Sequence, residues 1–164
     1  MTALLFFKHP FTAICCGSTQ TGKTQFVLRL IDNIKTMVVP TPKTAVYHFM
    51  EYQPVFDEYS QQVDFRQGVS KATELEELHD ALIIFDDRMM VNADLLNVFT
   101  RGSHNRQNSV IHIVQNFFNS NKNIRTISLN AQYLIFFKSP RDSSQFVHLA
   151  RQVFPQQPVC GGVV

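Results

Sequence analysis

Tryptophan is absent from this chain of 164 residues, and glycine and cysteine are scarce, at six and three residues. Because Cys15 and Cys16 are adjacent and Cys160 is remote, the cysteines form neither a disulfide framework nor a metal-ligand spacing. This usage favours a reducing, intracellular setting. No apolar run approaches the roughly 20 residues that span a bilayer, and residues 1–10 lack the features of a signal peptide. We therefore expect a soluble intracellular protein without a membrane partner.

The charge is divided unevenly along the chain. Residues 1–99 hold 8 Lys/Arg and 12 Asp/Glu, a net charge of −4, whereas residues 100–164 hold 7 Lys/Arg and one Asp, a net charge of +6. A basic C-terminal third suits a polyanion or bound phosphates, and a solvated basic face is an equal alternative. The length fits one domain, which we expect over residues 1–154, with an unpacked tail over residues 155–164 that contains two prolines and a glycine pair.

Residues 17–24 form a complete G-x-x-x-x-G-K-T phosphate-binding loop. They read Gly17-Ser18-Thr19-Gln20-Thr21-Gly22-Lys23-Thr24. An apolar strand pattern over residues 11–16 precedes this loop, and a helical pattern over residues 24–35 follows it. In such a loop the backbone N–H groups cradle phosphates, the lysine reaches the β- and γ-phosphates, and the threonine hydroxyl binds Mg²⁺. A surface turn that carries a lysine is the alternative, and the flanking strand and helix argue against it. We expect the chain to bind ATP or another nucleoside triphosphate.

Apolar strands alternate with helical segments along the rest of the chain. The patterns predict strands over residues 44–49, 81–85, 110–114 and 133–137. They predict helices over residues 71–80, 94–100 and 144–153, a short helix near residues 55–59, and a turn or short helix over residues 126–131. This alternation predicts an α/β fold, a three-layer αβα domain with a mostly parallel central sheet.

Acidic and polar residues follow two of the predicted strands. Asp86 and Asp87 come directly after the buried run 81–85, where the second half of a nucleotide site belongs. We predict that Asp86 holds Mg²⁺ through a water and that Asp87 orients the attacking water. Gln115 follows the next strand and is the candidate γ-phosphate sensor. This order predicts the ASCE, or RecA-like, subclass of P-loop NTPases, in which an extra strand lies between the phosphate-loop strand and the acidic strand. Polar residues that merely end a strand are the alternative.

An arginine that neutralises charge on the γ-phosphate is the remaining part of such a site. Arg88, Arg101, Arg106 and Arg125 are candidates. We assign Arg101, which we expect on a loop near the rim of the site, to catalysis. A solvated or salt-bridged surface role is the alternative for each of them.

Several stretches of the sequence carry a resemblance to a known family. Besides residues 17–24 and 83–87, they are residues 9–12, 52–58, 99–104, 109–117, 125–130, 137–142 and 148–152. Through them the chain resembles the viral genome-packaging ATPases of the FtsK/HerA type, with the greatest likeness to those of Maverick/Polinton transposons and adintovirus-like DNA viruses. The resemblance extends from about His9 to Pro155.

The resemblance implies a homo-oligomeric ring that hydrolyses ATP with Mg²⁺ and pumps double-stranded DNA into a preformed capsid. It places the family's lysine at Lys23, its Mg²⁺ ligands at Thr24 and Asp86, its catalytic acid at Asp87 and its sensor at Gln115. The aspartate at 87 departs from the glutamate of many relatives. The setting that it implies is an infected cell, in the nucleus or the cytoplasm, or a virion.

The resemblance also suggests where DNA would be contacted. Loops near Lys122, Arg125 and Arg141 are candidates for contacts with phosphates, which carry no sequence information. Two other functions stay open. One is a truncated or integrated remnant that binds nucleotide without turnover, since relatives generally continue beyond Arg151. The other is a small-molecule kinase, although no arginine-rich lid or acceptor-site pattern is visible.

Overall fold

The computed structural model describes residues 6–68, 71–86, 93–102, 105–116 and 122–137, together with residues 147 and 151. The strands are β1 (Phe7–Lys8), β2 (Thr12–Cys16), β3 (Val38–Val39), β4 (Thr44–Phe49), β5 (Asp64–Gln67), β6 (Ala81–Phe85), β7 (Ser109–Val114) and β8 (Tyr133–Phe136). The helices are α1 (Lys23–Asp32), α2 (Ile34–Met37), α3 (Phe56–Tyr59), α4 (Ala72–Glu76), α5 (Ala93–Asn97), the π-helix η1 (Val98–Gly102) and α7 (Lys122–Asn130).

The central sheet has six strands in the order β5-β4-β6-β7-β2-β8, and every neighbouring pair is parallel. Strand β7 therefore lies between β2, which precedes the phosphate loop, and β6, which precedes Asp86. This order confirms the prediction of an extra strand between the two. A separate two-stranded parallel sheet pairs β1 with β3.

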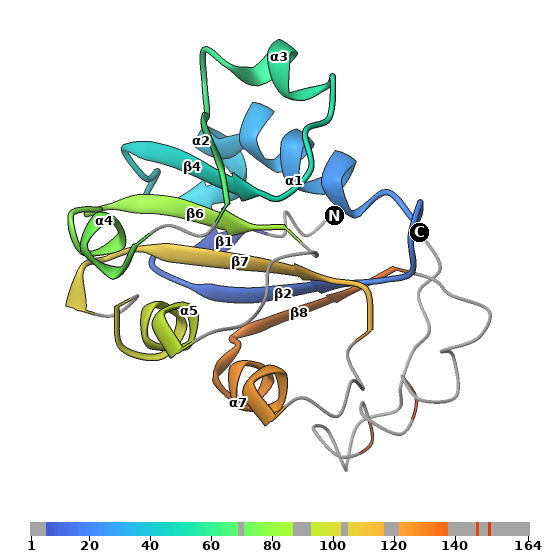
Figure 1. Ribbon diagram of the computed structural model, residues 1–164, viewed down its shortest axis with the longest axis vertical. Coiled ribbons are helices and arrows are strands. Elements are labelled where there is room, and N and C mark those ends of the chain that lie inside the picture. Colours follow the sequence, from blue (N-terminus) through green and yellow to red (C-terminus); the bar gives the residue numbers. More distant parts are fainter. Residues whose placement is uncertain are drawn as a thin grey trace, which may run out of the picture.

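Different helices cover the two faces of the central sheet (Figure 1). Helices α1, α2 and α3 pack on one face, and α4, α5, η1 and α7 pack on the other. Strand β2 shows why its sequence is apolar throughout. It sends Ala13 and Cys15 into one core and Ile14 and Cys16 into the other. A strand buried on both faces reads as an apolar run. The predicted three-layer α/β fold is confirmed.

The helix after the phosphate loop ends earlier than its sequence pattern predicts. An apolar stripe of Val27, Leu28, Leu30 and Ile31 is buried in the first core, as helical spacing requires. The predicted helix over residues 24–35 is nevertheless interrupted at Asn33, whose φ of −107° and ψ of 21° leave the helical region. The Asn33 side chain donates to the carbonyl of the residue four positions earlier, at 2.9 Å, and closes the last turn.

Other boundaries show which predictions the structure supports. Strands β4 and β6 coincide with the predicted runs, and β7 and β8 differ by one residue at one end. The edge strand β5 was missed because its short sequence, DFRQ, has no apolar pattern. Helix α4 is shorter than predicted, and α7 is longer, whereas α5 and η1 together cover the helix predicted over residues 94–100. The predicted helix over residues 144–153 and the tail lie outside the described residues, apart from residues 147 and 151. In the described part of the chain, no helix is long and apolar enough to cross a membrane.

Both cysteines of β2 are buried thiols that form no disulfide. Burial raises the pKa of the Cys15 thiol to about 12, against the opposing effect of the nearby Lys23 charge. A thiol with so high a pKa stays protonated and is a poor nucleophile or metal ligand. These cysteines are core residues, as their position in an apolar strand predicts.

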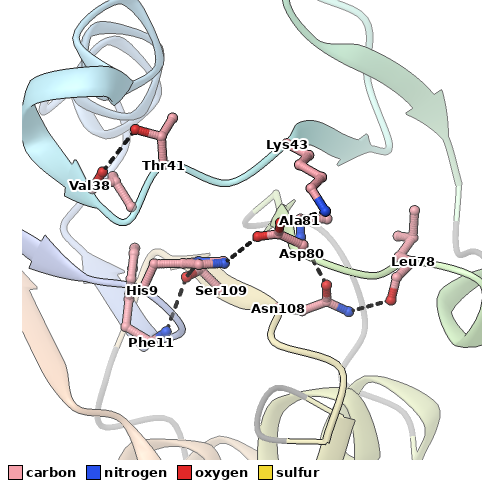
Figure 2. A network of polar contacts seen from close by, with 10 residues as sticks. All are labelled: His9, Phe11, Val38, Thr41, Lys43, Leu78, Asp80, Ala81, Asn108 and Ser109. Atoms are coloured by element: carbon pink, nitrogen blue, oxygen red, sulfur yellow. Dashed lines mark hydrogen bonds and ion pairs between the residues drawn. The ribbon is translucent and has the colours of Figure 1, made fainter.

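A polar network ties the amino ends of the strands together (Figure 2). His9 is buried and lies between Asp80, at 3.0 Å from its Nε2, and Ser109, whose Oγ contacts its Nδ1. The Ser109 Oγ also accepts a hydrogen bond from the Phe11 N–H at 3.0 Å. Lys43 completes the cluster, with its ammonium 3.3 Å from the Asp80 carboxylate. The network joins the segments that lead into β2, β4, β6 and β7.

A second buried polar group serves the same edge of the sheet. The Asn108 side chain accepts from the Ala81 N–H at 3.0 Å and donates to the Leu78 carbonyl at 2.7 Å (Figure 2). It therefore satisfies two main-chain groups, the N–H of the first residue of β6 and a carbonyl that precedes the strand. The Arg106 carbonyl accepts from the Asp80 N–H at 3.1 Å in the same place.

Candidate functional site

The loops that carry the predicted site residues meet at the carboxyl edge of the sheet. Strands β2, β7 and β6 are parallel neighbours, so the segments that follow them leave the sheet on the same side. The phosphate loop follows β2, Gln115 follows β7, and Asp86 follows β6. The Gly17 N–H donates to the Val114 carbonyl at 3.2 Å, which binds the start of the phosphate loop to the end of β7. The topology thus brings three of the predicted elements together.

The phosphate loop is closed by its own side chains. The Lys23 ammonium donates to the carbonyls of Gly17, at 2.7 Å, and Ser18, at 2.8 Å, and the residue is only 6% exposed. The Thr21 hydroxyl also donates to the Ser18 carbonyl, at 2.8 Å. An ammonium has three protons, so the lysine lies inside the curve of the loop with donor capacity for an anion.

Backbone conformation explains one of the two glycines of the motif. Gly22 has a φ of +92° and sits at the N-cap position of α1, where a residue with a side chain would be strained. Gln20 adopts a φ of +64°, a conformation that costs a non-glycine residue about 1–2 kcal/mol. Two left-handed residues within three positions give the loop its tight curve, which turns main-chain N–H groups inward.

The first turn of α1 suits a negatively charged ligand. It begins at Lys23 and contains no acidic residue. The unpaired N–H groups of a first helical turn carry partial positive charge, so an anion is favoured there. Thr24, the second residue of the helix, is half-buried and supplies a hydroxyl oxygen at the same end. Main-chain dipoles, an ammonium and a hydroxyl are the donor set for a phosphate with its metal.

Asp86 provides the carboxylate of this edge. It is 5% exposed and directly follows β6, and its N–H donates to the His48 carbonyl at 3.0 Å. In β6, Leu82 and Ile84 face the core that contains α1, so the alternation of the strand directs position 86 to the same side. We therefore expect the carboxylate on the face that also carries Lys23 and Thr24.

The chemistry of these donors fits Mg²⁺. This ion is bound in nucleotide sites through one or two carboxylates, a hydroxyl, waters and the phosphates of the substrate. Asp86 offers a carboxylate and Thr24 a hydroxyl of this kind. Among the described residues no group of three His, Cys, Asp or Glu could hold a metal ion. A Mg²⁺ ion bound by Thr24, Asp86 and phosphate oxygens needs no such group.

His48 is a residue of this region that sequence reasoning missed. Its ring stacks on Phe85, with ring centroids 5.1 Å apart and planes 14° apart, one position before Asp86. Burial, together with the smaller effect of the neighbouring Arg66 charge, lowers the pKa of His48 to about 4. His48 is thus neutral at physiological pH. Its position at the end of a predicted strand was the only available signal.

The predicted sensor and the arginine candidates differ in how they are placed. Gln115 is exposed at the carboxyl edge. Arg101 is exposed too. The sequence predicts a loop at this position, but the residue lies in the π-helix η1. Figure 1 shows α5, which η1 continues, below the part of the sheet that is remote from the phosphate loop. Arg106 lies at the amino edge, 3.9 Å from Glu76.

The remaining predicted residues are not characterised by the structure. Asp87 and Arg88 lie outside the described residues, and the same holds for the side chain of Arg125. The carboxyl edge therefore assembles Lys23, Thr24, Asp86 and Gln115 from the predicted set, and it does not include Arg106.

Phe137 is the second residue that sequence reasoning missed. The sequence places it at the end of a predicted strand, and the structure places its side chain against Gly17 of the phosphate loop. A Cβ added to Gly17 would lie 2.7 Å from Phe137 Cβ and 2.7 Å from Thr21 Oγ1. Gly17 is thus a glycine because neighbouring side chains leave no room for another atom. No periodicity in the sequence signals such a contact.

Comparisons with known proteins support the fold. No protein-family model matches the sequence, and no curated protein matches it. Among solved structures, the chain is similar to B204, the DNA-packaging ATPase from Sulfolobus turreted icosahedral virus. The TM-score is 0.56 with 12% identity, over 85% of this chain and 82% of that one.

Two structures of the genome-packaging NTPase B204 from Sulfolobus turreted icosahedral virus 2 are similar as well. The complex with sulfate gives a TM-score of 0.53 at 10% identity, over 91% of this chain and 87% of that one. The complex with AMPPCP gives 0.51 at 10% identity, over 90% and 88%. At this identity the likeness shows a shared α/β fold, and function has to be argued from the site.

Proposed function

We propose that this protein is an ATPase that drives translocation of double-stranded DNA, in the packaging of a viral genome into a capsid. The observation that carries the proposal is the position of the Lys23 ammonium, inside a closed phosphate loop at the start of α1. The fold shared with viral packaging NTPases supports the same reading. The relation to FtsK/HerA proteins and to Maverick/Polinton packaging ATPases belongs to this proposal.

The residues of the carboxyl edge take distinct roles in it. Lys23 turns from the loop carbonyls to the β- and γ-phosphates, and Thr24 and Asp86 hold Mg²⁺. Bound Mg²⁺ supplies charge neutralisation on the phosphate oxygens. Asp87 positions the attacking water, and Gln115 contacts the γ-phosphate or that water. Gln115 suits this role because it is exposed at the end of the strand between the two motifs.

A ring of identical subunits completes the proposed site. Arg101 is exposed in η1, and the helix that η1 continues lies away from the phosphate loop of the same chain. An arginine so placed suits a role in a neighbour's site, where it neutralises charge on the γ-phosphate. Lys122 and Arg125 lie in α7 and not on the loops that the sequence predicts; in this proposal they and the segment near Arg141 contact DNA phosphates. A capsid protein is the remaining partner, in an infected cell or a virion.

ATP hydrolysis with and without double-stranded DNA tests the proposal. We expect Mg²⁺-dependent turnover that rises with DNA of any sequence and falls with salt, because the contacts are to phosphates. Lys23→Ala should abolish turnover. Lys35→Ala, which removes an exposed lysine of α2, is the matched control and should leave it unchanged.

Two results would contradict this proposal in different ways. Nucleotide binding without turnover, with and without DNA, would favour a binding remnant. Turnover that depends on a small acceptor and ignores DNA would favour a kinase. Size measurement with ATP present then tests the ring, since a monomer under turnover conditions would exclude an arginine supplied in trans.

A further inference from the structure

The segment that follows β8 contacts the phosphate loop directly. Strand β8 pairs with β2 up to the register Cys16 opposite Phe136. One residue later the Phe137 N–H donates to the Cys16 carbonyl at 2.8 Å. The main chain of Phe137 is therefore fixed against the residue that immediately precedes Gly17, which places its side chain beside the loop.

The side chain of Phe137 lies across both glycines of the motif. Its Cβ and Cγ lie 2.7 Å and 3.6 Å from the position of a Cβ on Gly17, and its Cε1 lies 3.9 Å from the same position on Gly22. The ring also packs edge to face with Phe26 of α1, with centroids 5.8 Å apart. One aromatic side chain thus lies beside the start and the end of the loop and packs on the helix that follows.

The bonds inside the loop would have to share the Lys23 ammonium with a bound phosphate. Lys23 holds the carbonyls of Gly17 and Ser18, and a phosphate competes for the same ammonium protons. If the hydrogen bonds from Lys23 to the two carbonyls weaken, the shape of the loop depends more on its contacts with residues outside the loop. Two such contacts come from neighbouring strands: the Gly17 N–H bond to Val114 and the packing of Phe137.

We propose that Phe137 is a positioning residue, whose ring holds the phosphate loop in its phosphate-receiving shape by packing on Gly17, Gly22 and Phe26. It acts through the loop and makes no contact with the nucleotide base. This inference rests on the proposed function, because it concerns the same phosphate site. The proposal predicts that Phe137 contributes to the binding of the phosphate chain, both in a nucleotide and in a polyphosphate without base or ribose.

Binding measurements with two Mg²⁺-loaded ligands test the proposal: ATP, and inorganic tripolyphosphate, which has no base or ribose. Phe137→Ala should weaken the binding of both by a similar factor, about tenfold, the lower range seen when residues that orient a binding group are lost. Phe137→Tyr keeps the ring and should restore both affinities. The measurements are made well below the melting temperature of each variant.

A matched control separates positioning from general stability. Phe136→Ala removes the neighbouring ring of the same strand, which packs in the core on the opposite face of the sheet. It should lower the melting temperature without changing either affinity. If Phe136→Ala weakens both ligands as much as Phe137→Ala does, the effect is one of stability and the proposal is overturned.

The remaining outcomes are also decisive. Loss of ATP affinity alone, with tripolyphosphate binding intact, would mean that the ring contacts the base, which overturns a role through the loop. Unchanged binding of both ligands overturns it as well. A wild-type protein that binds neither ligand refutes the proposed function itself, and this result is distinct because it needs no variant.

Discussion

His9 Nε2 lies 3.0 Å from Asp80 Oδ1, and Ser109 Oγ contacts the other nitrogen of the same ring. The three side chains have the composition of a hydrolase triad, yet Ser109 is 0% exposed and its Oγ accepts from the Phe11 N–H. With the Nε2 proton donated to Asp80, the hydroxyl proton of Ser109 goes to Nδ1 and each group is satisfied. A nucleophile must reach its substrate, and the buried Ser109 hydroxyl cannot. The three side chains therefore have a structural role.

Asp80→Asn tests the structural value of that chain. The variant keeps the shape of the side chain and removes the charge that faces His9 and Lys43. We expect the free energy of unfolding to fall by about 1 kcal/mol at pH 7, the usual size for a charge-assisted hydrogen bond at a partly exposed group. Urea denaturation measures this loss in the free energy of unfolding. Asp57→Asn, which removes the charge that faces the exposed Tyr52 hydroxyl, is the control and should leave stability nearly unchanged.

The pH dependence of the same variant gives an independent check. Burial opposes ionisation of Asp80, but its bonds with Lys43 and His9 outweigh burial and lower its pKa. A lowered pKa in the folded state stabilises the fold in full above about pH 4, and this stabilisation is lost as the pH falls through the folded-state value. The difference between wild type and Asp80→Asn should therefore shrink below pH 4. A difference that grows on acidification would contradict the assignment.

The strands of the sheet interior could be read from the sequence because burial on both faces leaves an apolar run. Ala81–Phe85 and Thr44–Phe49 were predicted to the residue for this reason. Asp64–Gln67 was not, because three of its four side chains are polar and no apolar run marks it. The break of the first helix at Asn33 was missed too, since the apolar spacing continues into Ile34.

The phosphate loop could be predicted because its chemistry requires particular residues at fixed spacing. Lys23 and Gly22 are necessary wherever such a loop occurs, so the motif alone locates them. Phe137 lies 115 residues beyond Gly22 in the sequence and reaches the loop only through the pairing of β8 with β2. The stack of His48 on Phe85 likewise depends on the pairing of β4 with β6. Such contacts follow from strand order, which no local pattern contains.

Gly17→Ala tests the tight packing at the start of the phosphate loop. Its Cβ would lie 2.7 Å from Phe137 Cβ and from Thr21 Oγ1, which is closer than side chains normally approach, so the loop or the segment after β8 must shift. We expect ATP affinity to fall at least tenfold and stability to fall by about 1–3 kcal/mol, the usual cost of overpacking. Calorimetric titration and thermal denaturation measure the two effects.

Gly68→Ala is the control for the glycine substitution. Gly68 has a φ of +84°, so alanine is strained there, but no atom lies within 4 Å of the added Cβ. It should cost about 1 kcal/mol of stability and leave nucleotide binding unchanged. Equal losses of ATP affinity in the two variants would show that affinity merely follows stability.

His48 should make the fold sensitive to mild acid. Its pKa of about 4 in the folded protein lies below the 6.5 of an unfolded chain. The unfolded state therefore binds a proton first, and stability should decrease by about 3 kcal/mol as the pH falls from 6.5 to 4, with no further contribution from this residue below that range. His48→Phe, which keeps a ring against Phe85, should flatten this part of the profile. The exposed His79→Gln is the control and should leave the profile as steep as in wild type.

Substitutions at Asp86 and Gln115 should affect different steps, the first Mg²⁺ binding and the second hydrolysis. Asp86→Asn removes a buried carboxylate placed on the face of α1, so the gain in ATP affinity on adding Mg²⁺ should disappear while affinity without Mg²⁺ is kept or rises. Gln115→Ala leaves that gain intact. It should lower kcat by about 10²-fold with little change in KM, because a sensor contact strengthens in the transition state. Asn116→Ala, the neighbouring exposed amide, is the matched control and should retain turnover. If Asn116→Ala lowers kcat as much as Gln115→Ala does, the role of sensor does not belong to Gln115.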